Sequence, residues 1–240
     1  MPHAVHLRAA VALAGRFPAL SGVDLSVDPG EVVVVVGPNG AGKTSLLRTC
    51  AGLLPVTSGE AVVLGCDLRL DRAAVRPRVG LLGHTAPLYA ELTAAENVRF
   101  AVRAAGLASS RAEPALERLG LVGRLRRTTV ERLSAGQRKR VALAALVARS
   151  PELWLLDEPH AGLDASAREL LAAILCEAAA GGATVLVASH EPEVLRAQAT
   201  RTVAMTGGRV TGEAPAQPAG LRLAEPTDDP LAVGGGVHVA

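Results

Sequence analysis

The hydrophobic pattern of the first third of the chain predicts buried strands separated by turns. Residues 20–36 fit a strand, a turn and a second strand, with the turn at the Asp-Pro-Gly sequence of residues 28–30. The second strand, Val32–Val36, is an unbroken β-branched run and is therefore apolar on both faces. Such a strand belongs inside a covered, parallel sheet. Further short strands are predicted at residues 62–64, 79–82, 153–156 and 184–188.

Helical patterning predominates between residues 92 and 148. Thr93 followed by Glu96 is a capping box that opens one helix. Other helices are predicted at residues 44–51, 113–119, 134–147 and 166–180, and a closing hairpin at residues 202–210. The chain is therefore expected to have an α/β core that is interrupted by a mostly helical lobe.

The domain boundaries follow from these elements. We expect a core of residues 1–84 and 149–211, with a helical subdomain at about 85–148. After Thr211 the chain holds four prolines and a run of three glycines. Residues 212–240 are therefore predicted to be a disordered tail.

Composition limits the classes of function. The chain has 240 residues, 49% of them hydrophobic, which is enough for one sizeable core. Its net charge of +2 gives no electrostatic footprint for nucleic acid. The three cysteines form no CxxC pair and are expected to be reduced. We expect no secretory signal, and no apolar run reaches the ~18 residues that a membrane span needs. A role at a membrane would therefore require a separate partner.

Lysine is rare in this chain. Lys43 and Lys139 are the two lysines among 25 basic residues, and the others are arginines. A lysine where arginine is the default suggests that position 43 needs a compact ammonium rather than a planar fork. For Lys139 we infer no such requirement and attribute the residue to chance.

A glycine-rich loop follows the buried strand. Residues 37–44 match GxxxxGK[ST] in full, between a strand and a helix, which predicts a phosphate cradle rather than an ordinary turn with a spare lysine. Glycines let the backbone approach phosphate oxygens, and the helix N-terminus favours an anion. Lys43 is expected to bridge the β- and γ-phosphates, and the Thr44 hydroxyl to help hold Mg²⁺. The candidate nucleotide-binding residues are Gly37, Pro38, Asn39, Gly40, Ala41, Gly42, Lys43, Thr44 and Ser45.

Two later strands end in polar residues. The strand at residues 153–156 is followed by Asp157 and Glu158. By itself this is a solvated strand end, but beside a phosphate loop it predicts that Asp157 binds Mg²⁺ and that Glu158 is the general base. The strand at residues 184–188 is followed by Ser189 and His190. Because ligands bind at the carboxyl edge of such sheets, His190 is a candidate donor to the γ-phosphate.

Leu133-Ser134-Ala135-Gly136-Gln137 resembles the LSGGQ signature of ATP-binding cassette proteins. The motif order also matches: phosphate loop, signature, Asp157-Glu158-Pro159, a D-loop-like Gly162-Leu163-Asp164, and then His190. The resemblance covers about residues 4–211. It implies a RecA-like P-loop NTPase core with an N-terminal antiparallel β subdomain and an inserted helical subdomain.

The same resemblance implies that ATP is shared between two copies. In the family, two nucleotide-binding domains meet head to tail, and each ATP lies between the phosphate loop of one and the signature of the other. Ser134 and Gly136 would then contact the γ-phosphate in a homodimer or pseudo-dimer, and Gln137 would be a further residue of the ATP site. The alternative role of Ser134, a helix N-cap, is compatible with this one. Asp164 would tie the two sites together.

Three positions depart from the family pattern. His84 stands where the family usually has the Q-loop glutamine, and an imidazole, unlike an amide, can titrate near neutral pH. His160 replaces the usual threonine after Glu-Pro. Phe17, the candidate for stacking on adenine, lies a few residues later than expected.

Residues 82–84 and 91–100 are similar to the ATP-binding subunits of haem exporters of cytochrome c maturation. The resemblance implies an ATPase subunit at the cytoplasmic face of the cell membrane, which would drive a separate permease docked near residues 84–100. The alternatives are a soluble cassette protein that acts on ribosomes or DNA and a simple P-loop kinase. A single cassette without sustained heptads argues against the first, and the signature argues against the second.

Overall fold

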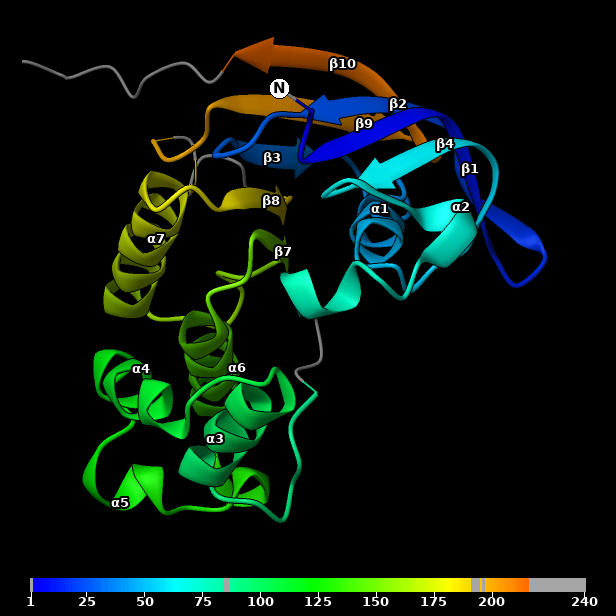
Figure 1. Ribbon diagram of the computed structural model, residues 1–240. Helices are drawn as coiled ribbons and strands as arrows, with labels where there is room; N and C mark the ends of the chain where they lie inside the picture. The colour runs from blue at the N-terminus through cyan, green and yellow to red at the C-terminus, as the bar shows by residue number, and fades with distance from the viewer. Residues whose placement is uncertain (1, 84–86, 191–194, 196, 216–240) are drawn as a thin grey trace, which may run out of the picture.

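The computed structural model describes residues 2–83, 87–190, 195 and 197–215, which form two sheets and a helical lobe (Figure 1). The strands are β1 (Val5–Ala14), β2 (Phe17–Val27), β3 (Val32–Val36), β4 (Val56–Val63), β5 (Cys66–Asp67), β6 (Val79–Leu82), β7 (Leu153–Asp157), β8 (Thr184–Ala188), β9 (Arg201–Thr206) and β10 (Arg209–Pro215). The α-helices are α1 (Lys43–Cys50), α2 (Leu68–Asp71), α3 (Ala94–Ala104), α4 (Ala112–Arg118), α5 (Gly123–Arg126), α6 (Ala135–Arg149) and α7 (Ala165–Ala180).

The larger sheet has the order β10-β9-β3-β8-β7-β6, and every pairing in it except that of β10 with β9 is parallel. Its strand β3 is buried on both faces, as the apolar run predicts: Val32 and Val34 belong to one core cluster, and Val33 and Val35 to the other. The interior position of this strand is therefore a direct consequence of its sequence.

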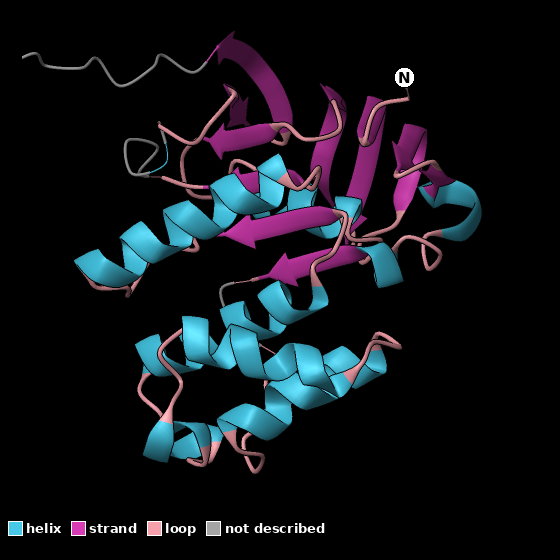
Figure 2. Ribbon diagram, turned by 60° about the vertical axis from the view of Figure 1, so that its left-hand side comes forward, coloured by secondary structure: helices cyan, strands magenta, loops and turns pink. Residues whose placement is uncertain are grey.

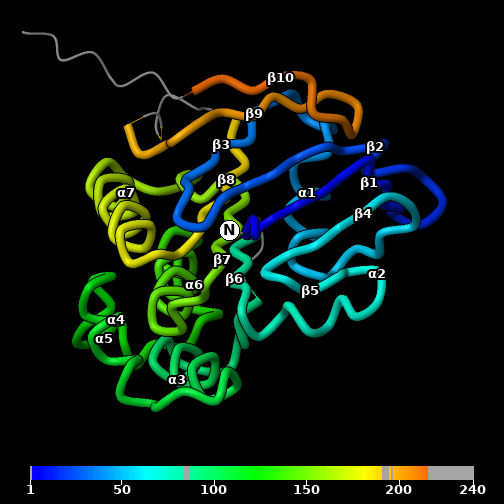
Figure 3. Tube along the Cα trace, turned by 45° about the horizontal axis from the view of Figure 1, so that its top comes forward, coloured from blue at the N-terminus to red at the C-terminus, as the bar shows by residue number. Residues whose placement is uncertain are grey.

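The second sheet is antiparallel, with the order β2-β1-β4-β5. Helix α1 contacts β1 and β2 of this sheet as well as β7 and β8 of the larger one, so it lies between the two sheets (Figure 3). The strand β1 had no counterpart among the predicted elements. Its hydrophobic alternation is interrupted at Ala9, which has a φ of +47° and lies in a register shift between β1 and β2.

Helices α3 to α6 form a separate lobe below the sheets (Figure 2). The predicted capping box at the start of α3 is confirmed: the Thr93 side chain accepts from the N–H of Glu96, and the Glu96 carboxylate accepts from the N–H of Thr93. Because this lobe and α7 share one core cluster with a face of the larger sheet, the lobe packs directly on the core domain.

The C-terminal hairpin is longer than predicted. Strand β10 continues to Pro215, so the expected boundary at residue 211 is four residues too early. The cause is pairing with β9, which satisfies the backbone of a segment whose glycine and proline content favours a loop. Residues 216–240 lie outside the described residues, and their predicted disorder stays a prediction. In the part of the chain that the structure describes, no helix is long and apolar enough to span a bilayer.

Candidate nucleotide-binding site

Three neighbouring strands deliver the predicted site residues to one edge of the larger sheet. β3 leads into the phosphate loop, β7 ends at Asp157, and β8 is followed by Ser189 and His190. Because β3, β8 and β7 are adjacent and parallel, their carboxyl ends meet at the same edge. The topology therefore brings together residues that are more than a hundred positions apart in the sequence.

The phosphate loop has the backbone conformation of an anion cradle. Gly37, Gly40 and Gly42 have φ values of +149°, +80° and +102°. A Cβ at Gly37 would lie 2.2 Å from the carbonyl oxygen of Met205, so no side chain fits there. Gly42 is the N-cap of α1 and provides no side-chain cap. The first N–H groups of α1 have no partner within the helix, and residues 42–45 line a cleft.

Lys43 lies inside this loop. Its side chain is 8% exposed, and Nζ donates to the carbonyl oxygens of Gly37 at 2.6 Å and Pro38 at 3.1 Å. The rest of the sequence-predicted loop, Asn39, Gly40, Ala41, Thr44 and Ser45, lines the same cleft. An ammonium held in the loop by two carbonyl oxygens is suited to binding phosphate oxygens in the same cleft.

Thr44 and Asp157 meet, as predicted from their motifs. The Thr44 hydroxyl donates to Oδ2 of Asp157 at 2.7 Å, and Asp157 is 7% exposed. Both groups offer hard oxygen ligands, which suit Mg²⁺. Among the described residues, no group of three or more His, Cys, Asp or Glu side chains could hold a metal.

Glu158 is surrounded by two imidazoles. Its Oε1 accepts from the N–H of His190 at 3.0 Å and lies 2.8 Å from Nδ1 of the same residue. His160, which is 1% exposed, places Nε2 3.5 Å from Oε2 of Glu158 and 3.3 Å from Oγ of Ser189. The histidine that replaces threonine after Glu-Pro is therefore a buried neighbour of the predicted general base.

The cleft at the phosphate loop has a volume of about 660 Å³. Asp157 and Glu158 line it together with five residues that the sequence motifs did not indicate: Pro18, Ala19, Ser21, Gly207 and Gly208. The turn between β9 and β10 is held against the loop, since the N–H of Gly208 donates to Ala41 at 2.9 Å. Phe17, the adenine-stacking candidate, is 79% exposed and does not itself line the cleft, although the next residue, Pro18, does.

The signature lies in a different hollow, of about 350 Å³. Ser134 caps α6: its Oγ accepts from the N–H of Gln137 at 3.2 Å, and Gln137 Oε1 accepts from the N–H of Ser134 at 2.9 Å. Ser134, Gly136 and Gln137 line this hollow together with Gly162 and Asp164. No described residue lines both this hollow and the phosphate-loop cleft. Within one chain, the signature and the phosphate loop therefore do not form a common site.

Asp164 and Lys139 connect the signature helix to the segment after Glu158. Asp164 caps α7 by accepting from the N–H of Ala167 at 2.8 Å, and it pairs with Arg140 at 2.9 Å. Lys139 Nζ donates to the carbonyl oxygens of Glu158 at 2.6 Å and Ala161 at 2.8 Å. Lys139 therefore holds two backbone carbonyls, a contact that the sequence analysis did not predict. His84, the Q-loop candidate, lies outside the described residues.

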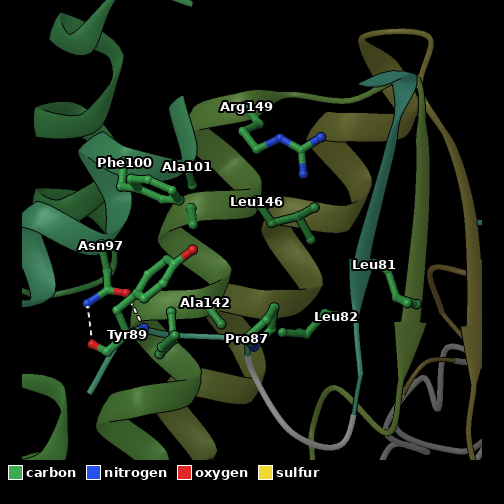
Figure 4. Close-up of a pocket in the computed structure, with 12 residues that line it drawn as sticks. Leu81, Leu82, Pro87, Tyr89, Asn97, Phe100, Ala101, Ala142, Leu146 and Arg149 are labelled. Atoms are coloured by element: carbon green, nitrogen blue, oxygen red, sulfur yellow. Dashed lines mark hydrogen bonds between the residues drawn. The ribbon is translucent and has the colours of Figure 1, made fainter. Parts of the chain in front are cut away.

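A third hollow, of about 460 Å³, lies between the lobe and the sheet edge (Figure 4). We call it the lobe groove. Its residues come from β6, α3, α6 and the segment before α3: Leu81, Leu82, Pro87, Leu88, Tyr89, Asn97, Phe100, Ala101, Ala142, Ala145, Leu146 and Arg149. The rings of Tyr89 and Phe100 pack edge to face, with centroids 4.9 Å apart, and are half exposed. The lobe groove is therefore an accessible, mainly apolar surface.

Comparison with known proteins agrees with this arrangement. The family described as "ABC transporter" matches residues 20–161. The cytochrome c biogenesis ATP-binding export protein CcmA of Bordetella bronchiseptica is 42% identical over 201 residues, which cover 82% of this chain and 88% of that protein. The protein of the same name from Nitrosomonas europaea is 40% identical over 183 residues, covering 75% and 85% of the two chains.

Solved structures show the same fold. A dimeric ATP-binding cassette in a post-hydrolysis state, bound to ADP and Pi, superposes with a TM-score of 0.81 at 27% identity, covering 89% of this chain and 99% of that one. The fold and the site thus define a P-loop ATPase with an inserted helical lobe and a signature helix. The chain belongs to the ABC transporter family, in which it is an ATP-binding cassette that hydrolyses ATP.

Proposed function

We propose that the chain is the ATP-hydrolysing subunit of an exporter and that it closes as a head-to-tail dimer around two ATP molecules. The observation that carries the proposal is the separation of the phosphate-loop cleft from the signature hollow within one chain. Each half of the site presents groups suited to an anion, so a second copy supplies what the first lacks. The comparison cassette bound to ADP and Pi is dimeric, which supports this reading.

The phosphate loop and its neighbours would hold the nucleotide. The N–H groups at the start of α1 and the Lys43 ammonium would bind the phosphates, and Phe17, exposed next to the cleft-lining Pro18, is the candidate to stack on the adenine. The hydroxyl of Thr44 and the carboxylate of Asp157 fit Mg²⁺. When bound, that ion neutralises charge on the phosphate oxygens.

Glu158 would be the general base. The residue lines the cleft at the strand end, where its carboxylate would accept a proton from the attacking water. His190, bound to the same carboxylate through its backbone N–H, can orient Glu158 and donate to the γ-phosphate. Ser134, Gly136 and Gln137 of the second copy would contact that phosphate from the opposite side. Asp164, beside the signature hollow, would link the two sites.

The lobe groove is the proposed docking site for the permease. Its occupant would be an apolar cytoplasmic segment of a separate membrane-spanning subunit, because Tyr89 and Phe100 leave their rings half exposed there. The named relatives are export proteins of cytochrome c biogenesis, which supports an exporter of this type rather than a soluble cassette protein. The chain would then lie at the cytoplasmic face of the membrane, held by the permease, with the predicted Q-loop residue His84 close to the groove in sequence.

The test of the catalytic assignment is Glu158→Gln. Removal of the general base should slow hydrolysis by about 10²–10⁴-fold while ATP binding is retained. The ATP-bound variant should then sediment at twice the monomer mass. Hydrolysis at the wild-type rate would remove Glu158 as the base, and a monomer that binds ATP at every protein concentration would remove the dimer.

The test of the transport assignment is co-purification from membranes. The tagged wild-type chain should bring one membrane-spanning subunit with it, whereas Phe100→Asp, which places a charge in the lobe groove, should not. Arg48→Ala, on the exposed end of α1, is the matched control and should bring the same subunit. Recovery of ribosomes or DNA in place of a membrane protein would favour the soluble alternative.

A further inference from the structure

Lys139 joins the signature helix to the backbone of the predicted general base. It lies on α6, two residues after Gln137, and its ammonium donates to the carbonyl oxygens of Glu158 at 2.6 Å and Ala161 at 2.8 Å. These two carbonyls bracket the turn that follows β7, which is itself closed by the Ala161 N–H donating to Glu158. One charged side chain on the helix thus fixes both ends of the turn.

The same end of α6 touches this segment at two further places. A Cβ at Gly136 would lie 3.3 Å from the carbonyl oxygen of Gly162, and Arg140 pairs with Asp164 at 2.9 Å. Lys139 and Arg140 therefore hold this segment at residues 158, 161 and 164, and residue 136 lies close to residue 162. As long as these contacts are kept, a displacement of the signature helix also displaces residues 158–164.

The backbone of Glu158 needs such support. Its φ is +49°, a left-handed conformation that costs a non-glycine residue of the order of 1 kcal/mol or more. Its N–H is held by Ala188 of β8 at 2.9 Å, and its C=O is held by Lys139. With both peptide groups held, the direction in which the side chain leaves the backbone is fixed, and the backbone N–H of His190 then binds the carboxylate at 3.0 Å.

We propose that Lys139 is a positioning residue that holds the Glu158 carboxylate in its productive orientation and couples it to the signature end of the same chain. Burial lowers the pKa of the Lys139 ammonium, and the charges of Glu158 and Asp157 act in the opposite direction, so the charged form is held by its neighbours rather than by water. This inference rests on the proposed function of Glu158. In a head-to-tail dimer it gives Glu158 a direct mechanical connection to the ATP of the opposite site.

The test is Lys139→Met, which keeps the length of the side chain and removes the donor. Misplacement of a catalytic group by about 1 Å costs up to 10²-fold, so kcat should fall ten- to a hundredfold while KM for ATP changes less than about twofold. Lys139→Arg, which retains a cationic donor, should recover most of the rate. Arg76→Met is the matched control, because Arg76 also donates twice to one backbone carbonyl, that of Gly52, away from the site. It should leave kcat unchanged.

Repeating the Lys139→Met substitution in the Glu158→Gln variant separates a positioning role of Lys139 from a general contribution to stability. In Glu158→Gln the carboxylate is already lost, so adding Lys139→Met should lower the residual rate no further. An equal fold-loss in both backgrounds, or a kcat at the wild-type level in Lys139→Met, would overturn the inference. If Lys139→Met does not fold, the same two measurements, in the wild-type and in the Glu158→Gln background, are made with Lys139→Gln. Wild-type hydrolysis by Glu158→Gln alone would instead reject the proposed base, so the two failures are distinguishable.

Discussion

The two helices that we propose to face the ATP phosphates, α1 behind the phosphate loop and α6 behind the signature, begin in opposite ways. α1 starts at Gly42, in a left-handed conformation, and has no side-chain cap. α6 starts at Ser134 with a complete capping box. The first-turn N–H groups of α1 therefore remain available to a nucleotide bound at the phosphate loop of the same chain. In α6, the capping box already satisfies part of the helix N-terminus within a single chain, without a second copy.

The largest effect on ATP turnover should come from a substitution at α1, the helix without a side-chain cap. Lys43→Ala removes the ammonium inside the phosphate loop and should reduce ATP turnover by at least about 10³-fold, because phosphoryl transfer depends on charge stabilisation. Lys43→Arg should be nearly as inactive if the position needs a compact ammonium. Both are measured as kcat/KM for ATP, with Arg48→Ala on the same helix as the control. Substantial turnover by Lys43→Ala would contradict the phosphate-loop assignment.

The capping box of α6 can be compared with the similar capping box of α3. Ser134→Ala and Thr93→Ala each remove one N-cap hydroxyl, and each should lower the free energy of unfolding by about 1 kcal/mol. Ser134→Ala should also reduce turnover by about tenfold or more, since a hydrogen bond to a charged group contributes ~1.5–3 kcal/mol. Denaturant unfolding and ATPase rates of the isolated cassette check both. Equal turnover in the two variants would mean that Ser134 serves only as a helix N-cap and does not contact ATP.

Two glycines should also differ. Gly37→Ala forces a Cβ to within 2.2 Å of a backbone oxygen and should destabilise the protein by about 2 kcal/mol or more. Gly136→Ala meets its nearest neighbour at 3.3 Å on a helix and should change stability by less than about 1 kcal/mol. The midpoints of urea unfolding compare them directly. A large loss of stability in Gly136→Ala would show that the signature turn is packed more tightly than this distance indicates.

The smallest expected effect is on the pH dependence of stability at the capping box of α3. The N–H and hydroxyl of Thr93 hold the pKa of Glu96 below its ordinary value of 4.5. A lowered pKa in the folded state contributes stability that is present above the unfolded pKa and is lost as pH falls through the folded one. The box of α6 has Gln137 in that position and does not titrate. Glu96→Gln should therefore be less stable than wild type at neutral pH, with the difference vanishing below the folded pKa. A difference that persists there would mean that the carboxylate charge is not the cause.

Much of the fold was predictable because it depends on local patterns. The run Val32–Val36 indicated an interior parallel strand, and the capping box at Thr93 and the N-cap at Ser134 marked two helix starts. The strand β1 was not predicted, because a bulge at Ala9 shifts the alternation of its hydrophobic residues. The end of β10 was placed too early, since its pairing with β9 outweighs a loop-like composition.

The candidate site divides in the same way. Thr44 and Asp157 were predicted to share a metal, and their 2.7 Å hydrogen bond brings them together as the motifs indicated. Lys139 was missed because its partners are backbone carbonyls of residues 158 and 161, which carry no mark in the sequence. The contribution of Gly208 to the cleft depends likewise on a main-chain contact with Ala41. Side-chain chemistry leaves motifs, whereas contacts with the backbone become visible only in three dimensions.

The central claim is that the ATP site is completed by a second copy, and mixing two defective chains tests it most directly. Lys43→Ala disables the phosphate loop, and Ser134→Glu places a negative charge where the γ-phosphate of the partner should lie. A mixed dimer of the two contains one site built from two unmodified halves. We expect an equal mixture to hydrolyse ATP well above the sum of its separate components. A mixture no more active than that sum would contradict the account.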